Sequence, residues 1–276
     1  MNVSNDTDVE KLVPAGPVLL DLYPNGIAHI RLNCPATSNG LDVESLRALH
    51  DVVMLCHGDR RVRVVLLSGE GKNFCAGGDV RLFASKGEGL PYYLRQATSY
   101  LQIAVGALMR LNPPVIAAVH GFAAGGGGLG LVCSSDLVVA TKSAKFMAGA
   151  TRAGMAPDAG ASVSLARIIG LRRAMDLLLT NRIIDAQEAL ALGLVNRVVP
   201  DDQLFAESMA FAQELAAGAP MALAATKRLL WNGVGLGVEA AMPEEARTVS
   251  ELSGTEDVRE GLAAVIEKRQ PKFTGR

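Results

Sequence analysis

The chain has 276 residues, of which 49% are hydrophobic and 20% charged, and its formal net charge is −1. This composition is typical of a folded protein and argues against intrinsic disorder. A charge balance so near zero gives no reason to expect a nucleic acid or a membrane surface as partner. Of the 29 glycines, six fall within residues 121–130. Such a cluster indicates backbone that needs a close approach to something.

Cysteine usage and the N-terminus bear on location. The cysteines, Cys34, Cys56, Cys75 and Cys133, form no C-x-x-C pair and no zinc-type spacing with histidine. We therefore expect free thiols, no metal and a cytoplasmic protein. The polar N-terminus has no signal-peptide pattern. The uncharged residues 111–135 contain prolines and glycines, which favours a buried strand, turn and helix over a membrane span.

Strands and helices alternate over most of the chain. In chain order we predict strands at 18–23 and 27–32 joined by a turn, a helix at 43–56, a strand at 62–67, a helix at 92–111, a strand at 114–119, a turn at 121–128, a helix at 129–133, a strand at 137–140, a helix from 158 to about 169, a helix at 185–192 and a strand at 194–199. This alternation predicts an α/β fold with parallel strands.

Three regions follow from this pattern. Residues 1–15 are expected to be a flexible tail, and 16–199 the α/β core. Residues 200–276 contain apolar positions at helical spacing and predict three or four helices. Because such a region cannot close a core alone, we expect it to pack on the body or on a neighbouring subunit.

The motifs typical of nucleotide-binding proteins and serine hydrolases are either incomplete or absent. Gly125–Gly130 satisfies G-x-G-x-x-G, but residues 137–157 contain no acidic residue for a dinucleotide ribose. There is also no P-loop and no G-x-S-x-G elbow. These absences argue against a Rossmann dehydrogenase, a P-loop NTPase and a serine hydrolase.

Two glycine-rich loops each follow a predicted buried strand, one at Gly69–Asp79 and the other at His120–Gly128. Such loops can bring two backbone N–H groups to one ligand oxygen, which is the geometry of an oxyanion hole. Either loop alone is better explained as a tight turn with close packing.

Taken together, five motifs resemble the enoyl-CoA hydratase/isomerase (crotonase) superfamily over nearly the whole chain. They are Asn33-Cys34-Pro35 with Leu41-Asp42, Phe74-Cys75-Ala76-Gly77-Gly78-Asp79, the segment 114–136, Gly154–Gly160, and Glu260-Gly261 with Glu267-Lys268-Arg269-Gln270-Pro271-Lys272-Phe273. The resemblance implies a crotonase-like spiral of ββα units with a C-terminal helical trimerisation region. It also implies an acyl-CoA thioester substrate, a homotrimer or a dimer of trimers, and no cofactor beyond coenzyme A as part of the substrate.

The resemblance also assigns residues. The N–H groups of Gly78 and Gly127 would hold the thioester oxygen of an enolate intermediate. Positions that match substrate or coenzyme A contacts are Ala36, Ala76, Asp79, Lys272 and Phe273. Candidates for the acyl pocket are Phe83, Tyr92, Tyr93 and Met109, which could equally be core residues of a helix.

The family's hydratases use two glutamates, and this sequence has neither. The first falls at Leu129 when counted from Gly121, or at Gly130 when counted back from Asp136. The second falls at Ala150. Water addition therefore lacks its acid–base groups.

Asp158 is the remaining candidate base. It matches the place where several double-bond isomerases of the family carry an aspartate, which favours conversion of 3-enoyl-CoA to 2-enoyl-CoA. The alternative is that Asp158 only caps the following helix. We expect Asp79, Asp136 and His120 to be structural. A 2-enoyl-CoA hydratase, another acyl-CoA reaction and a non-catalytic acyl-CoA-binding protein remain as alternatives.

Overall fold

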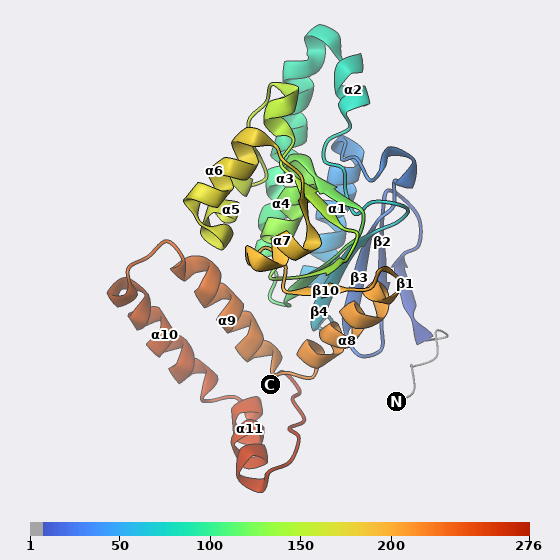
Figure 1. Ribbon diagram of the computed structural model, residues 1–276. Helices are drawn as coiled ribbons and strands as arrows, with labels where there is room; N and C mark the ends of the chain where they lie inside the picture. Colours follow the sequence, from blue (N-terminus) through green and yellow to red (C-terminus); the bar gives the residue numbers. More distant parts are fainter. Residues whose placement is uncertain (1–7) are drawn as a thin grey trace.

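The computed structural model describes residues 8–276 (Figure 1). Its large sheet contains, in spatial order, β1 (Glu10–Val13), β2 (Val18–Leu22), β3 (Ile27–Leu32), β4 (Val64–Gly69), β5 (Val115–Val119), β7 (Leu137–Thr141) and β10 (Arg197–Val199). Strands β1 to β3 pair antiparallel, and β3 to β10 pair parallel. A small second sheet has the order β6 (Phe122–Ala124), β8 (Lys145–Met147) and β9 (Ile184–Asp185).

Eleven α-helices connect and cover these strands within the described residues. They are α1 (Val43–Gly58), α2 (Val80–Ser85), α3 (Leu90–Arg110), α4 (Gly125–Ser134), α5 (Ala161–Ile169), α6 (Leu171–Thr180), α7 (Ala186–Ala191), α8 (Leu204–Ala216), α9 (Pro220–Gly233), α10 (Val238–Leu252) and α11 (Glu256–Glu267). The predicted hairpin, the parallel strands and the helical C-terminal region are confirmed.

Side chains of the large sheet point alternately into two cores. In β4, Val64 and Leu66 pack toward α8, whereas Val65 and Leu67 pack toward α1, α3 and α4. Because successive side chains of a strand face opposite sides, a strand covered on both faces is apolar at every position. This burial explains the continuous apolar runs that predicted β4 and β5.

Several elements differ from the predictions. Glu10–Val13, within the expected tail, forms edge strand β1 against β2, and residues 1–7 of that tail lie outside the described residues. Helix α4 begins at Gly125, inside the predicted turn, because buried packing overrides the low helix propensity of glycine. The small sheet was not predicted, since two- and three-residue strands leave no readable period, and helices α2 and α6 were not predicted either.

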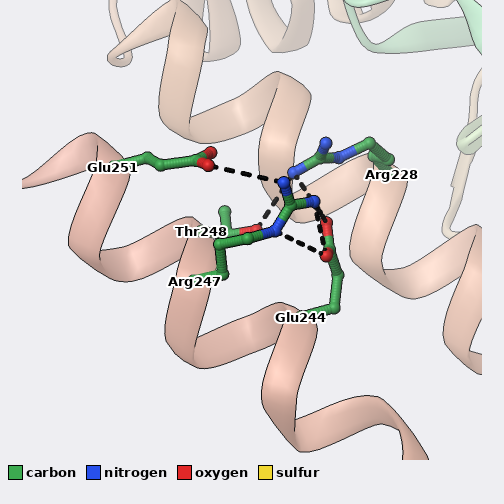
Figure 2. Close-up of polar contacts among 5 residues, drawn as sticks. All are labelled: Arg228, Glu244, Arg247, Thr248 and Glu251. Atoms are coloured by element: carbon green, nitrogen blue, oxygen red, sulfur yellow. Dashed lines mark hydrogen bonds and ion pairs between the residues drawn. The ribbon is translucent and has the colours of Figure 1, made fainter.

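The C-terminal helices behave in two ways. Helix α8 packs on the large sheet, whereas α9, α10 and α11 extend from one side of the body (Figure 1). In the described chain, the only buried residues of α9 and α10 are the polar Lys227 and Thr248. Polar contacts join the two helices: the Arg228 guanidinium donates to Thr248 Oγ1 at 3.0 Å and pairs with Glu244 at 3.4 Å (Figure 2).

Three of the four cysteines are buried. All four cysteines are free, and burial raises the pKa of the Cys56, Cys75 and Cys133 thiols to about 12. Across residues 8–276, no helix is both long and apolar enough to cross a membrane. The same residues contain no group of three or more His, Cys, Asp or Glu that could hold a metal ion.

Candidate active site

The first glycine-rich loop is held like a strand between two neighbours. Phe74 N–H donates to His120 O at 2.9 Å, and Ala124 N–H donates to Cys75 O at 2.9 Å. On the other side, Leu41 N–H donates to Gly77 O at 2.7 Å. These hydrogen bonds bring the end of this loop to the N-terminus of α4.

The Asn39 side chain holds the same loop in place through hydrogen bonds, a role that the sequence did not predict. It is 1% exposed, and its amide nitrogen donates to the carbonyls of Glu70, Asn73 and Phe74 at 2.8–3.1 Å. Its Oδ1 accepts from the Cys34 N–H at 2.8 Å. A buried asparagine can satisfy donors and acceptors at once, which makes it suited to joining two loops. The sequence signal was only the asparagine two residues before Leu41.

The two glycine-rich loops meet at close quarters. A Cβ on Gly77 would lie 2.8 Å from Ala124 O and 3.0 Å from the Gly125 Cα, so only glycine permits this approach. The first N–H groups of a helix have no intrahelical partner. Those of Gly125 to Gly127 are therefore available, and within residues 8–276 no group accepts a hydrogen bond from Gly78 N–H. Available backbone donors therefore lie on two segments in close contact, which is the arrangement that an oxyanion hole needs.

A cavity of about 310 Å³ opens beside these glycines. Glycines and apolar side chains dominate its lining, which consists of Leu41, Leu46, Ala76, Gly78, Val80, Phe83, Leu94, Ala97, Thr98, Leu101, Gly125, Gly126, Gly127, Met147, Gly149, Ala150, Ala153, Met155, Ala156 and Asp158. Among these described residues, Asp158 is the only ionisable one. The size and the apolar lining suit a small-molecule acyl group.

Asp158 does not cap the helix that follows it. The N-cap residue of α5 is Gly160, and in the described chain no side chain caps this helix. The carboxylate instead faces the cavity and touches Gly126. Burial raises the pKa of the Asp158 carboxyl above its ordinary value, and a hydrogen bond from its own backbone N–H opposes this only in part. A raised pKa is expected of a carboxyl that acts as a base near neutral pH.

The positions of the two hydratase glutamates have different surroundings. Leu129 is 3% exposed and packs in the large core, so its side chain does not line the cavity. Gly130 faces the turn after Asp158, because a Cβ there would overlap the Ala159 methyl. Ala150 does line the cavity, where it presents only a methyl group.

The four aromatic and methionine candidates for the acyl pocket separate. Phe83 lines the cavity, and the tip of its ring lies against Gly78. Tyr93 lies behind Phe83, with ring centroids 6.0 Å apart, and its hydroxyl accepts from Val43 N–H. Tyr92 is 75% exposed and Met109 packs against the large core. Neither of these two, nor Tyr93, lines the cavity.

The positions matched to coenzyme A are not all at the cavity. Ala76 lines it, and Ala36 is exposed in the loop that Asn39 ties to the first glycine-rich loop. The Asp79 carboxylate accepts from the N–H groups of Arg81 and Leu82 and so caps α2.

The C-terminal pair lies apart from the cavity within one chain. Phe273 lines a groove with residues of α9 and α11, and the Lys272 N–H donates to the Glu260 carboxylate at 2.7 Å. A contact of either residue with coenzyme A stays a prediction.

Two further polar residues hold the fold. The Asp136 carboxylate accepts from Val115 N–H and Trp231 Nε1 and pairs with Lys227 at 2.7 Å, which joins α9 to the sheet. Burial lowers the pKa of Lys227, and Asp136 opposes that shift. His120 Nε2 contacts Gly71 O at 2.9 Å and does not line the cavity.

Comparison with known proteins extends this picture. A family model described as enoyl-CoA hydratase/isomerase matches residues 23–276. A Rhodobacter capsulatus protein named "Probable enoyl-CoA hydratase" is 38% identical over 252 residues, which cover 91% of this chain and 95% of that protein. The crystal structure of an enoyl-CoA hydratase from Bacillus anthracis has a TM-score of 0.89 and 31% identity, covering 95% of this chain and 100% of that one. A Mycobacterium smegmatis enoyl-CoA hydratase structure has a TM-score of 0.88 and 32% identity, covering 94% and 99%.

Proposed function

This chain belongs to the enoyl-CoA hydratase/isomerase family, and we propose that it shifts the double bond of a 3-enoyl-CoA to give the conjugated 2-enoyl-CoA. One observation carries the proposal: Asp158 is the only ionisable side chain among the described residues that line the cavity. Proton transfer at carbon needs a titratable group within reach of that carbon. A double-bond shift needs one such group, whereas the family's hydratases use two.

In the proposed reaction, the Asp158 carboxylate removes a proton from C2 of the 3-enoyl thioester. The electron pair delocalises through the double bond onto the thioester oxygen, and the N–H groups of Gly78 and Gly127 stabilise this dienolate. The same carboxyl returns the proton to C4, which leaves the double bond between C2 and C3. No atom is gained or lost, and no cofactor is needed beyond the coenzyme A of the substrate.

Three physical effects support this route. Each backbone donor of an oxyanion hole contributes about 2.7–4 kcal/mol to the transition state. Burial raises the pKa of Asp158, which makes its carboxylate a stronger base than an exposed aspartate. The apolar lining of the cavity also keeps water away from the dienolate.

A second candidate is hydration of a 2-enoyl-CoA, which is favoured by the names of the relatives, since these are called enoyl-CoA hydratases. It would have to proceed without an acid at Leu129, Gly130 or Ala150. For this reason we rank it second. We also propose that residues 200–276 assemble the chain into a homotrimer or a dimer of trimers.

The test compares two substrates by the absorbance of the conjugated thioester. With 3-enoyl-CoA, isomerisation makes the absorbance rise, and with 2-enoyl-CoA it leaves the absorbance nearly constant. A fall in the second assay would support hydration instead, and tight binding of both esters without turnover would indicate a non-catalytic binding protein.

Replacing the proposed base is the sharper experiment. We expect Asp158→Asn to lower kcat for isomerisation by about 10²–10⁴-fold, the usual contribution of a general acid–base group. The control is Asp51→Asn, because the Asp51 side chain is 77% exposed on α1. An unchanged kcat in Asp158→Asn would exclude Asp158 as the base.

A further inference from the structure

The glycine run of α4 contains more glycine than the oxyanion hole needs. Helix residues four apart lie on the same face, one turn above the other. Gly126 and Gly130 have this spacing, and both face the turn that contains Asp158 and Ala159. Because neither glycine carries a side chain, together they leave a groove on the surface of α4.

The Asp158–Ala159 pair fills that groove. A Cβ on Gly126 would coincide with Asp158 Oδ1 and lie 3.1 Å from Oδ2. A Cβ on Gly130 would overlap the Ala159 methyl and lie 3.7 Å from the Ala159 Cα. Each glycine therefore accommodates one side chain of the turn.

The turn itself adopts a conformation that its sequence does not favour. Ala159 has φ +51°, a left-handed value that is costly for a residue with a Cβ, and it is 4% exposed. Such a conformation persists only where surrounding contacts enforce it. The groove provides that contact, since the Ala159 methyl is enclosed against Gly130.

We propose that the groove formed by Gly126 and Gly130 positions the Asp158 carboxylate for proton transfer. The inference rests on the proposed function only in taking Asp158 as the base. Asp158 is the catalytic residue, whereas Gly126, Gly130 and Ala159 are positioning residues that act through it. Their effect is geometric, since an alanine at either glycine keeps the backbone N–H groups of the helix.

The first test is Gly126→Ala, with Gly106→Ala as matched control. Gly106 also lies within a helix, but the nearest atom to a Cβ there is the tip of Arg110 at 3.4 Å. We expect Gly126→Ala to lower kcat on 3-enoyl-CoA by about 10²-fold, since a misplacement of about 1 Å can have that effect. KM should change little, and the acid limb of kcat should move to lower pH as the carboxyl leaves its buried position.

The second test is a rescue. Gly130→Ala should also lower kcat, because its methyl displaces Ala159. Adding Ala159→Gly removes the methyl group with which the side chain introduced by Gly130→Ala would clash, and glycine adopts the left-handed φ at no cost. We expect the double variant Gly130→Ala/Ala159→Gly to have the same kcat as Ala159→Gly alone. A double variant as slow as Gly130→Ala would overturn the proposal, and this test applies even if Gly126→Ala fails to fold.

A measurement of stability separates this proposal from the proposed reaction. Since the pKa of Asp158 is raised in the folded state, stability is lost progressively as the pH rises from the unfolded pKa of about 3.9 to the folded pKa, and the full loss persists at higher pH. Asp158→Asn should therefore gain in Tm over the wild type as the pH rises from 4 to 8. In a Gly126→Ala background we expect this gain to disappear.

The outcomes are distinct. If the wild type does not isomerise 3-enoyl-CoA but the Tm gain disappears with Gly126→Ala, the reaction assignment is wrong and the groove stands. If the wild type isomerises and Gly126→Ala keeps its kcat, its pH profile and the Tm gain, the groove proposal is wrong.

Discussion

At the scale of single residues, the environment of one carboxyl sets the chemistry of the cavity. The Asp158 carboxyl is partly buried, and the hydrogen bond from its own backbone N–H compensates only in part for the water it loses. Burial without full compensation disfavours the charged form of a carboxyl and raises its pKa.

We expect the raised pKa of Asp158 to appear in the pH dependence of isomerisation. The base must be ionised to accept the C2 proton, so kcat should be constant at high pH and fall as the pH drops through the pKa of Asp158. Because burial raises that pKa, the fall should be centred above 3.9, the ordinary value of aspartate. The measurement is kcat under saturating 3-enoyl-CoA between pH 4 and 9. A limb centred at or below 3.9 would contradict a buried base.

At the scale of elements, the site depends on how three loops are joined. The first glycine-rich loop pairs with residues 120–124 on one side and with Leu41 on the other. Asn39 adds three side-chain hydrogen bonds to carbonyls of residues 70–74. Gly78 N–H is thereby held beside the N-terminus of α4 before any ligand arrives, which is the condition for effective oxyanion stabilisation.

Asn39→Ala should therefore weaken both the fold and the site. Loss of the amide leaves buried backbone groups without a partner, and we expect the free energy of unfolding to fall by about 2–3 kcal/mol. Urea denaturation measures this change. The control is Asn33→Ala, which removes one exposed hydrogen bond to Gly16 O and should cost less than about 0.5 kcal/mol. Equal effects in both variants would refute this role of Asn39.

At the scale of the whole molecule, the C-terminal helices leave apolar surface uncovered. Helices α10 and α11 carry large apolar side chains that are 62–80% exposed, namely Val249, Leu262, Val265 and Ile266. The α9–α10 pair is joined mainly by charged and polar groups (Figure 2). Several large apolar side chains exposed on neighbouring helices are typical of an interface between proteins. They fit the proposed assembly of three or six copies.

We expect charged substitutions on this surface to dissociate the assembly. Ile266→Glu combined with Val249→Glu should shift the mass in sedimentation equilibrium toward that of one chain, because burying two carboxylates in an apolar interface is unfavourable. Leu55→Glu is the control, since Leu55 is 50% exposed on α1 and outside the C-terminal helices. A wild type that sediments as a monomer at micromolar concentration would contradict the proposal.

Local sequence patterns were sufficient to predict several strands, a hairpin and the family of this protein. Continuous apolar runs predicted β4 and β5, since a strand buried on both faces is apolar throughout. The turn at Gly26 predicted the first hairpin, and the order of five motifs indicated the family. Each of these signals is carried by residues that are close together in the chain, or by their order along it.

Contacts between distant segments decided the rest. Periodicity could not tell whether Asp158 capped a helix or faced a cavity, because that depends on Gly126, 32 residues earlier. Nor could it separate Phe83 at the cavity from Tyr92 in solvent, since both are aromatic and near the start of a helix. The glycine cluster is evident in the sequence. Which of its glycines supply backbone donors and which form the groove for the Asp158 turn depends on how α4 packs against that turn. The sequence shows that Gly126 and Gly130 lack side chains, but only the tertiary structure shows that Asp158 and Ala159 occupy the space that those side chains would fill.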